Sequence, residues 1–287
     1  MRIFILLLLI IIALCGCISQ TENTAQVRAA TTITPLGEFV SAVGGERVNV
    51  SVLVPPGAEP HTFEPSPSQI RQIADADIYF KNGVGLESWM DNIIGVNPHM
   101  LVVDTSRNVS LIAGTDEATS ADGAMAMDNH IWLSPRRAII QVQNICDGLI
   151  AVDPAGKDYY INNRDNYIAE LKELDAYLNS TFANTTKKKF VVLHPAWIYF
   201  ARDYGLEQIA IEVEEKEPGP RYLAEVVDVA RANNITTVFV EPQYNPKLAE
   251  VIAKEIDGKV VSIDDLAPNY IDNMRIVGEK IAESLRS

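Results

Sequence analysis

The chain has 287 residues, of which 47% are hydrophobic and 22% are charged, a composition typical of a folded globular protein. Its length favours two domains, because single domains usually hold roughly 100 to 200 residues. Lysines and arginines number 24 against 38 aspartates and glutamates, so the formal net charge is −14. Such a surface repels phosphates, which excludes nucleic acid and anionic lipid as general partners and is compatible with a cation as ligand.

The N-terminus has the pattern of a leader. Arg2 precedes an apolar run over residues 3–14, and two cysteines, Cys15 and Cys17, follow. A basic residue, a short apolar run and a small-residue exit predict a lipoprotein signal peptide over residues 1–16. The run is too short to span a membrane as a mature helix, which needs about 20 residues. The site resembles a lipobox with an uncommon Cys15, and implies acylation of Cys17.

We therefore expect an extracytoplasmic protein anchored to the outer face of the cell membrane through lipidated Cys17, with an ordinary secretory signal as the alternative. Residues 17–29 are polar and lack periodicity, which predicts a flexible tether. With Cys15 removed and Cys17 acylated, Cys146 is the only thiol left, so no disulfide within the chain is expected. Cys146 lies in an apolar helical pattern and is predicted to be core.

Strands and helices alternate along the rest of the chain, which predicts parallel sheets. In the N-terminal lobe, residues 30–155, the expected strands are 30–34, 47–54, 77–81 and 100–104, and the helices are 36–43, 66–76, 86–94 and 138–150. In the C-terminal lobe, residues 185–287, the expected strands are 190–193, 208–213, 237–240 and 260–263, and the helices are 197–204, 221–233, 246–256 and 269–285. The fold class is α/β, with two similar lobes, each a mostly parallel four-stranded sheet flanked by helices.

Residues 156–184 are expected to join the lobes as one linker helix. Tyr160, Tyr167, Leu171 and Leu178 keep a 3.6-residue rhythm among many charges. If about 25 residues are helical, the segment is roughly 37 Å long at 1.5 Å per residue. That length is enough to run the height of both lobes.

The sequence contains four histidines, and His61, His130 and His194 lie in turn-like stretches just after predicted strands. The fourth, His99, enters a strand from its amino end and is expected to be structural or solvent-facing. Single histidines are more often structural than ligating, given the many roles of the side chain. Ligands bind outside the carboxyl ends of strands in open α/β sheets, so these three should converge on one cleft. Three neutral imidazoles suit zinc.

A fourth ligand should be a carboxylate or water. Asp264, at the end of the last predicted strand, is the first candidate, and Asp265 follows it directly. Glu59, two residues before His61, is a lesser candidate, as are Glu241 and Asp128. These acids are equally suited to orienting the histidines, because metal-bound imidazoles nearly always donate a second hydrogen bond.

The stretches around the three histidines, together with residues 240–243 and 264–266, resemble the zinc- and manganese-binding solute receptors of metal ABC transporters, the ZnuA- and TroA-like group. The resemblance runs from about residue 31 to the C-terminus. It implies two α/β lobes joined by one long rigid helix, with the metal in the cleft between them. It places His61, His130 and His194 on the family's histidine positions and Asp264 on its usual carboxylate.

One detail departs from the family pattern, because the common Asp-Pro-Leu reads Asp264-Asp265-Leu266 here. Which aspartate ligates is therefore left open. Many manganese-dedicated relatives carry a glutamate where this chain has His194, and an imidazole there favours a borderline ion such as Zn²⁺. We expect Zn²⁺, with Mn²⁺ as the alternative. Residues 113–127 contain no histidine, so no auxiliary metal-collecting loop is expected.

The predicted function is an extracytoplasmic receptor that captures Zn²⁺ and delivers it to the membrane permease of an ABC transporter, as a monomer and not an enzyme. A zinc-dependent hydrolase is one alternative, since three histidines and a water also form a catalytic site. An adhesin or a binder of a larger chelate on the same scaffold is another. The sequence contains no HExxH or GxSxG motif, which disfavours hydrolysis.

Overall fold

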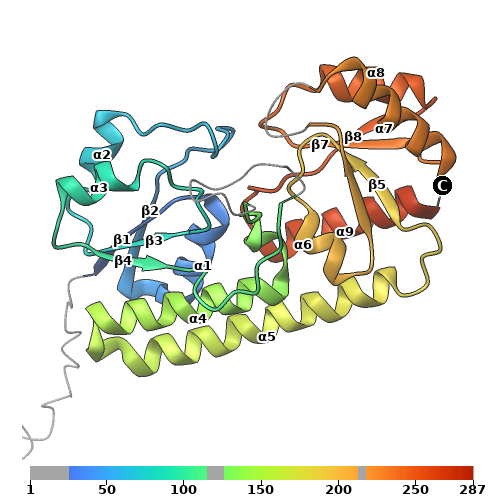
Figure 1. Ribbon diagram of the computed structural model, residues 1–287. Coiled ribbons are helices and arrows are strands. Elements are labelled where there is room, and N and C mark those ends of the chain that lie inside the picture. Colours follow the sequence, from blue (N-terminus) through green and yellow to red (C-terminus); the bar gives the residue numbers. More distant parts are fainter. Residues whose placement is uncertain (1–25, 115–125, 213–217, 287) are drawn as a thin grey trace, which may run out of the picture.

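The computed structural model describes residues 26–114, 126–212 and 218–286. Two lobes lie side by side along one long helix (Figure 1). The expected signal peptide, the acylated Cys17 and nearly all of the expected tether fall outside the described residues. In the part of the chain that the structure describes, the search for a helix long and apolar enough to cross a membrane finds none.

The N-terminal lobe is built on a parallel sheet with strand order β2-β1-β3-β4. Its strands are β1 (Val27–Thr31), β2 (Val48–Val52), β3 (Ile78–Lys81) and β4 (Leu101–Asp104). The sheet begins at Val27, three residues before the expected start of the lobe. Polar composition and lack of periodicity predicted tether here, but the guanidinium and backbone N–H of Arg28 both donate to the Asp77 carboxylate, the guanidinium at 2.9 Å. The strand therefore tolerates an exposed charge there.

The helices of this lobe are α1 (Thr34–Gly44), α2 (Pro67–Ile73), α3 (Met90–Val96) and α4 (Pro135–Val152). Each of α1, α2 and α4 has a proline in its first turn, where the missing N–H costs no hydrogen bond. Ser134 caps α4 by accepting a hydrogen bond from the Arg137 N–H. This cap, four residues after His130, fixes the start of α4 at Pro135.

The C-terminal lobe repeats the plan, with a parallel sheet in the order β6-β5-β7-β8. Its strands are β5 (Lys189–Val192), β6 (Glu207–Ala210), β7 (Thr237–Val240) and β8 (Lys259–Ser262). Its helices are α6 (Ile198–Asp203), α7 (Pro220–Ala232), α8 (Lys247–Glu255) and α9 (Tyr270–Arg286). The equivalent strand order confirms the prediction of two similar α/β lobes.

Helix α5 (Lys157–Phe182) has 26 residues, about 39 Å of helix at 1.5 Å per residue. It contacts α1 and α4 of the first lobe and α9 of the second, and Figure 1 shows it passing beneath both. Its buried stripe recurs at helical spacing and comprises Tyr160, Tyr167, Ile168, Leu171, Leu174, Leu178 and Phe182. The main hydrophobic core includes these residues and extends into both lobes, so the lobes share one core along α5.

Candidate metal centre

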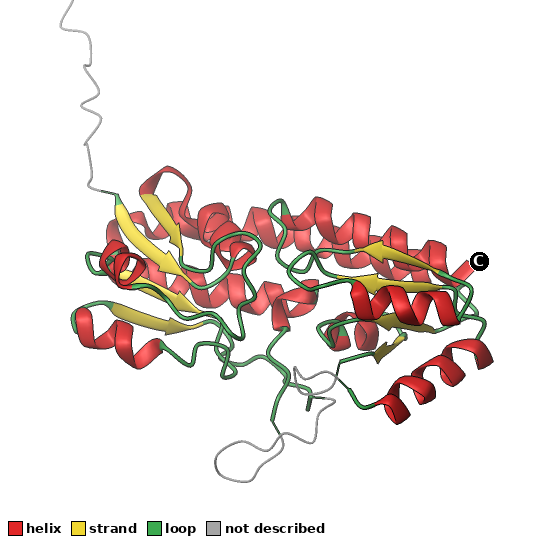
Figure 2. Ribbon diagram, turned by 90° about the horizontal axis from the view of Figure 1, so that it is seen from above, coloured by secondary structure: helices red, strands yellow, loops and turns green. Residues whose placement is uncertain are grey.

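The strands of the two sheets run toward the space between the lobes, so their carboxyl ends face each other (Figure 2). His61 lies on the loop between β2 and α2, and His130 lies between β4 and α4. His194 comes two residues after the end of β5, in the opposite lobe. Each parallel sheet places the loops that follow its strands at its carboxyl edge. Because the two carboxyl edges face each other, residues distant in sequence meet between the lobes.

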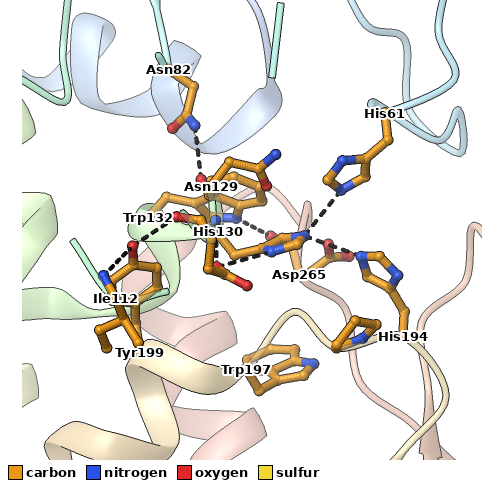
Figure 3. A network of polar contacts seen from close by, with 12 residues as sticks. His61, Asn82, Ile112, Asn129, His130, Trp132, His194, Trp197, Tyr199 and Asp265 are labelled. Atoms are coloured by element: carbon orange, nitrogen blue, oxygen red, sulfur yellow. Dashed lines mark hydrogen bonds and ion pairs between the residues drawn. The ribbon is translucent and has the colours of Figure 1, made fainter. Parts of the chain in front are cut away.

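The three predicted histidines converge. The Nε2 atom of His130 lies 3.1 Å from the Nε2 atom of His61 and 3.1 Å from that of His194 (Figure 3). All three ligand atoms lie within 4.8 Å of one another. Zinc–nitrogen bonds of 2.0–2.1 Å at a tetrahedral angle separate two ligand nitrogens by about 3.3 Å. The spacing of the histidines therefore suits a tetrahedral zinc ion.

The site favours the neutral form of two of its imidazoles, those of His61 and His194, and the neutral form is the one that binds metal. Burial, reinforced by the neighbouring His130, lowers the pKa of His61 to about 3. Burial also lowers the pKa of His194 well below its usual value, with His130 and His61 adding to the effect. Protons therefore compete only weakly with a metal ion for the nitrogens of His61 and His194.

His130 is oriented from both lobes. Its Nδ1 atom lies 3.2 Å from Asp128 Oδ1, and its backbone N–H donates to the same oxygen. The hydroxyl of Tyr199, in α6, donates to the Asp128 carbonyl at 2.7 Å. On the other side, the side-chain amide of Asn82 donates to the Asn129 carbonyl at 2.8 Å (Figure 3). Asp128 thus has the position of an orienting partner, with its carboxylate on the ring nitrogen opposite Nε2.

The two aspartates after β8 have different surroundings. Asp264, the first candidate for fourth ligand, accepts hydrogen bonds at Oδ1 from the Leu266 N–H at 2.9 Å and from Gln243 Nε2 at 3.2 Å. Asp265 is only 5% exposed, and its Oδ1 atom has no hydrogen-bond partner among the described residues. Figure 3 shows Asp265 beside His130. Neither aspartate belongs to the group of ligand atoms within 4.8 Å, which contains the three histidines.

Comparison with known proteins agrees with this geometry. The profile of the family "Zinc-uptake complex component A periplasmic", ZnuA, matches residues 30–284. The chain belongs to the ZnuA family. It is 31% identical to the high-affinity zinc uptake system protein ZnuA of Bacillus subtilis, over 96% of this chain and 94% of that protein. It is 28% identical to the manganese-binding lipoprotein MntA of Halalkalibacterium halodurans, over 95% and 94% of the two chains.

A solved structure of the ZnuA type has the same architecture. The crystal structure of a ZnuA deletion mutant with zinc bound superposes with a TM-score of 0.86, at 36% identity, over 90% of this chain and 98% of that one. The family and these relatives are named for zinc uptake and for manganese binding. The two-lobed fold with a long connecting helix is therefore the ZnuA-type receptor fold, as the resemblance implied.

The remaining predicted acids lie around the three histidines of this ZnuA-family chain. Glu59 accepts the backbone N–H groups of His61 and Thr62, each at 2.7 Å, and its Oε1 atom is 3.9 Å from His61 Nε2. Glu241 is completely buried and accepts the indole N–H of Trp197 at 2.8 Å. Burial raises the pKa of Glu241 well above its usual value, and the nearby Asp265 adds to the rise.

Sequence reasoning missed several residues that connect the lobes at the site. The Trp132 indole donates to the Asp265 carbonyl at 2.8 Å, and the Tyr270 hydroxyl donates to the Trp132 carbonyl at 2.7 Å. The Tyr244 ring stacks on His194. Trp132 follows His130 by two residues and Tyr244 follows Glu241 by three, so proximity in sequence to a candidate ligand was the available signal.

Proposed function

We propose that this chain is an extracytoplasmic receptor that captures Zn²⁺ between its lobes and delivers it to the membrane permease of an ABC transporter. The observation that carries the proposal is the convergence of three histidine Nε2 atoms from both lobes, 3.1 Å apart in two pairs, with His130 and His194 buried. Three imidazoles favour zinc over the harder manganese ion. The relative named for zinc and the zinc-bound neighbour support the same cargo, and the relative named for manganese keeps Mn²⁺ as the alternative.

We propose His61, His130 and His194 as ligands, with the carboxylate supplied from the pair Asp264 and Asp265. The geometry favours Asp265, because Asp264 already accepts two hydrogen bonds while Asp265 is buried with an unpartnered oxygen. A buried carboxylate without a partner is costly unless it gains one. A metal ion held by the histidines would supply that partner.

The alternatives find less support. A hydrolase needs an open coordination position and a free general base. Glu59 accepts backbone and side-chain hydrogen bonds from His61 and Thr62, and Glu241 accepts the Trp197 N–H. Glu59 is therefore engaged through both carboxylate oxygens, and Glu241 through Oε1, while Glu241 Oε2 has no hydrogen-bond partner among the described residues. The adhesin and larger-chelate alternatives rest on no feature of the described residues.

For the location, we propose that Cys17 carries the lipid anchor and that the receptor acts as a monomer. The apolar run over residues 3–14 before Cys17 supports the anchor, and a relative is itself named a lipoprotein. The wild type should incorporate a labelled fatty acid, and the Cys17→Ser variant should not. Labelling of Cys17→Ser at the wild-type level would overturn the assignment of Cys17 as the anchor.

The test of the function is zinc affinity measured against competing chelators. His61→Ala, His130→Ala and His194→Ala should each weaken zinc binding by more than the roughly 10- to 100-fold that loss of an orienting partner causes. The exposed His99 is a matched control, and His99→Ala should bind zinc like the wild type. Unchanged affinity in all three site variants would refute the proposal. Competition with Mn²⁺ in the same assay tests the choice of metal.

A further inference from the structure

We propose that Tyr244 is a positioning residue that ties the two lobes together across the metal site and slows the release of bound metal. The inference rests on the proposed function, because it concerns the same site. Tyr244 belongs to the loop after β7, in the C-terminal lobe. Its side chain contacts one histidine of its own lobe and the loop that carries another histidine of the opposite lobe.

The first contact fixes the ring of His194. The centroids of the Tyr244 and His194 rings are 4.6 Å apart and their planes differ by 18°, within the range of favourable aromatic stacking. The Nδ1 atom of His194 has no hydrogen-bond partner among the described residues, and the Glu212 carboxylate is 3.7 Å away. Stacking on Tyr244 therefore holds this ring, whereas a carboxylate hydrogen bond holds His130.

The second contact crosses between the lobes. The Tyr244 hydroxyl donates to Glu59 Oε1 at 3.4 Å. The same oxygen accepts the His61 backbone N–H at 2.7 Å, and the other carboxylate oxygen accepts the N–H and hydroxyl of Thr62. Glu59 thus organises the loop that carries His61.

These two contacts link metal release to the separation of the lobes. His61 and His194 lie in different lobes, and Tyr244 touches the ring of one and the carboxylate that holds the loop of the other. Any opening that separates the two histidines must break the Tyr244–Glu59 hydrogen bond. The hydroxyl and the ring make separable contributions, because phenylalanine keeps the stacking and loses the hydrogen bond.

The experiment is stopped-flow transfer of zinc from the loaded protein to a fluorescent chelator, with association measured separately. Tyr244→Phe should release zinc about three- to tenfold faster, the effect of losing roughly one hydrogen bond, with an unchanged association rate. Tyr244→Leu, which also loses the stacked ring, should release zinc faster still. Tyr177 is a matched control, since its hydroxyl donates to Glu279 at 2.7 Å on the exposed surface of α5. Tyr177→Phe should release zinc at the wild-type rate.

A double-mutant cycle with Glu59→Ala, which removes the acceptor, separates the hydrogen bond from a general loosening of the fold. Tyr244→Phe should add less to the release rate in the Glu59→Ala background than in the wild type. Release rates of Tyr244→Phe and Tyr244→Leu equal to the wild-type rate, in a protein that binds zinc, would overturn the role of Tyr244 alone. A wild-type protein that binds no zinc would overturn the proposed function as well.

Discussion

At the scale of single residues, the site depends on two neighbouring aspartates, and the sequence left open which of them is the fourth ligand. Asp264 and Asp265 are neighbours in the loop after β8, and their side chains have different surroundings. Asp264 binds its own loop, while Asp265 is buried near His130. Burial raises the pKa of the Asp265 carboxyl against the opposing effect of His130. Metal binding would therefore favour the ionised form of a group that is otherwise partly protonated.

The two aspartates can be separated by substitution. Asp265→Asn should weaken zinc binding by at least about tenfold, because it removes a charged oxygen ligand, whereas Asp264→Asn should change it by less. Calorimetry in buffers of different ionisation enthalpy should show proton release on zinc binding that decreases in Asp265→Asn. Stronger loss in Asp264→Asn than in Asp265→Asn would return the ligand role to Asp264, the residue that the family pattern favours.

His61 makes the stability of the metal-free protein dependent on pH. Its pKa is about 3 in the folded state, against about 6.5 when unfolded. Between these values the unfolded chain binds more protons, so the free energy of unfolding falls as the pH drops below 6.5. The loss at this position should reach about 2 kcal/mol near pH 5.

The effect of His61 is isolated by comparing variants. His61→Gln removes this proton uptake, so in urea unfolding of the metal-free protein the variant should gain stability relative to the wild type as the pH falls from about 7 to about 5. The raised pKa of Asp265 acts in the opposite direction but is common to both proteins. A stability difference that does not change with pH would contradict the lowered pKa of His61.

At the scale of elements, the strands were predictable because buried parallel strands read as short apolar runs. The run at residues 237–240 became β7 with the same bounds. The helix expected over residues 86–94 instead begins at Met90. Glu87 explains the difference, because its carboxylate accepts the N–H groups of Asn82 and Gly83 and holds residues 82–89 in a buried loop. Buried apolar residues in that loop imitated a helical pattern.

The close packing of α4 on the first sheet gives a test at this scale. A Cβ atom at Gly148 would lie 2.8 Å from Phe80 and 2.9 Å from Val103. Overpacking in Gly148→Ala should therefore lower the free energy of unfolding by about 1–3 kcal/mol. The higher helix propensity of alanine should offset about 1 kcal/mol of this loss. Gly95→Ala, in α3, is the control, because no described atom lies within 4 Å of its Cβ position. Gly95→Ala gains the same helix propensity without the close contacts, so urea unfolding should place Gly148→Ala about 1–3 kcal/mol below it in stability. Equal stabilities of the two variants would contradict the packing of α4.

At the scale of the whole molecule, contacts between the lobes were the part that sequence reasoning could not reach. Tyr244 and Glu59 are 185 residues apart, and Arg137 and Asp203 are 66 apart. No local pattern reports such pairs. Arg137 and Asp203 form a nearly buried ion pair at 2.8 Å that joins α4 to α6. Together with α5, these contacts hold the histidines of both lobes in one arrangement.

That arrangement is the central claim, and diffraction at the zinc absorption edge tests it most directly. Crystals of protein purified without added metal should show an anomalous peak between the lobes, about 2.0–2.2 Å from the Nε2 atoms of His61, His130 and His194 and from an oxygen of Asp265. A zinc peak that lacks any of these histidines would contradict the account. So would a zinc-bound water in place of the aspartate, with Glu59 or Glu241 beside it as base, because that arrangement is catalytic.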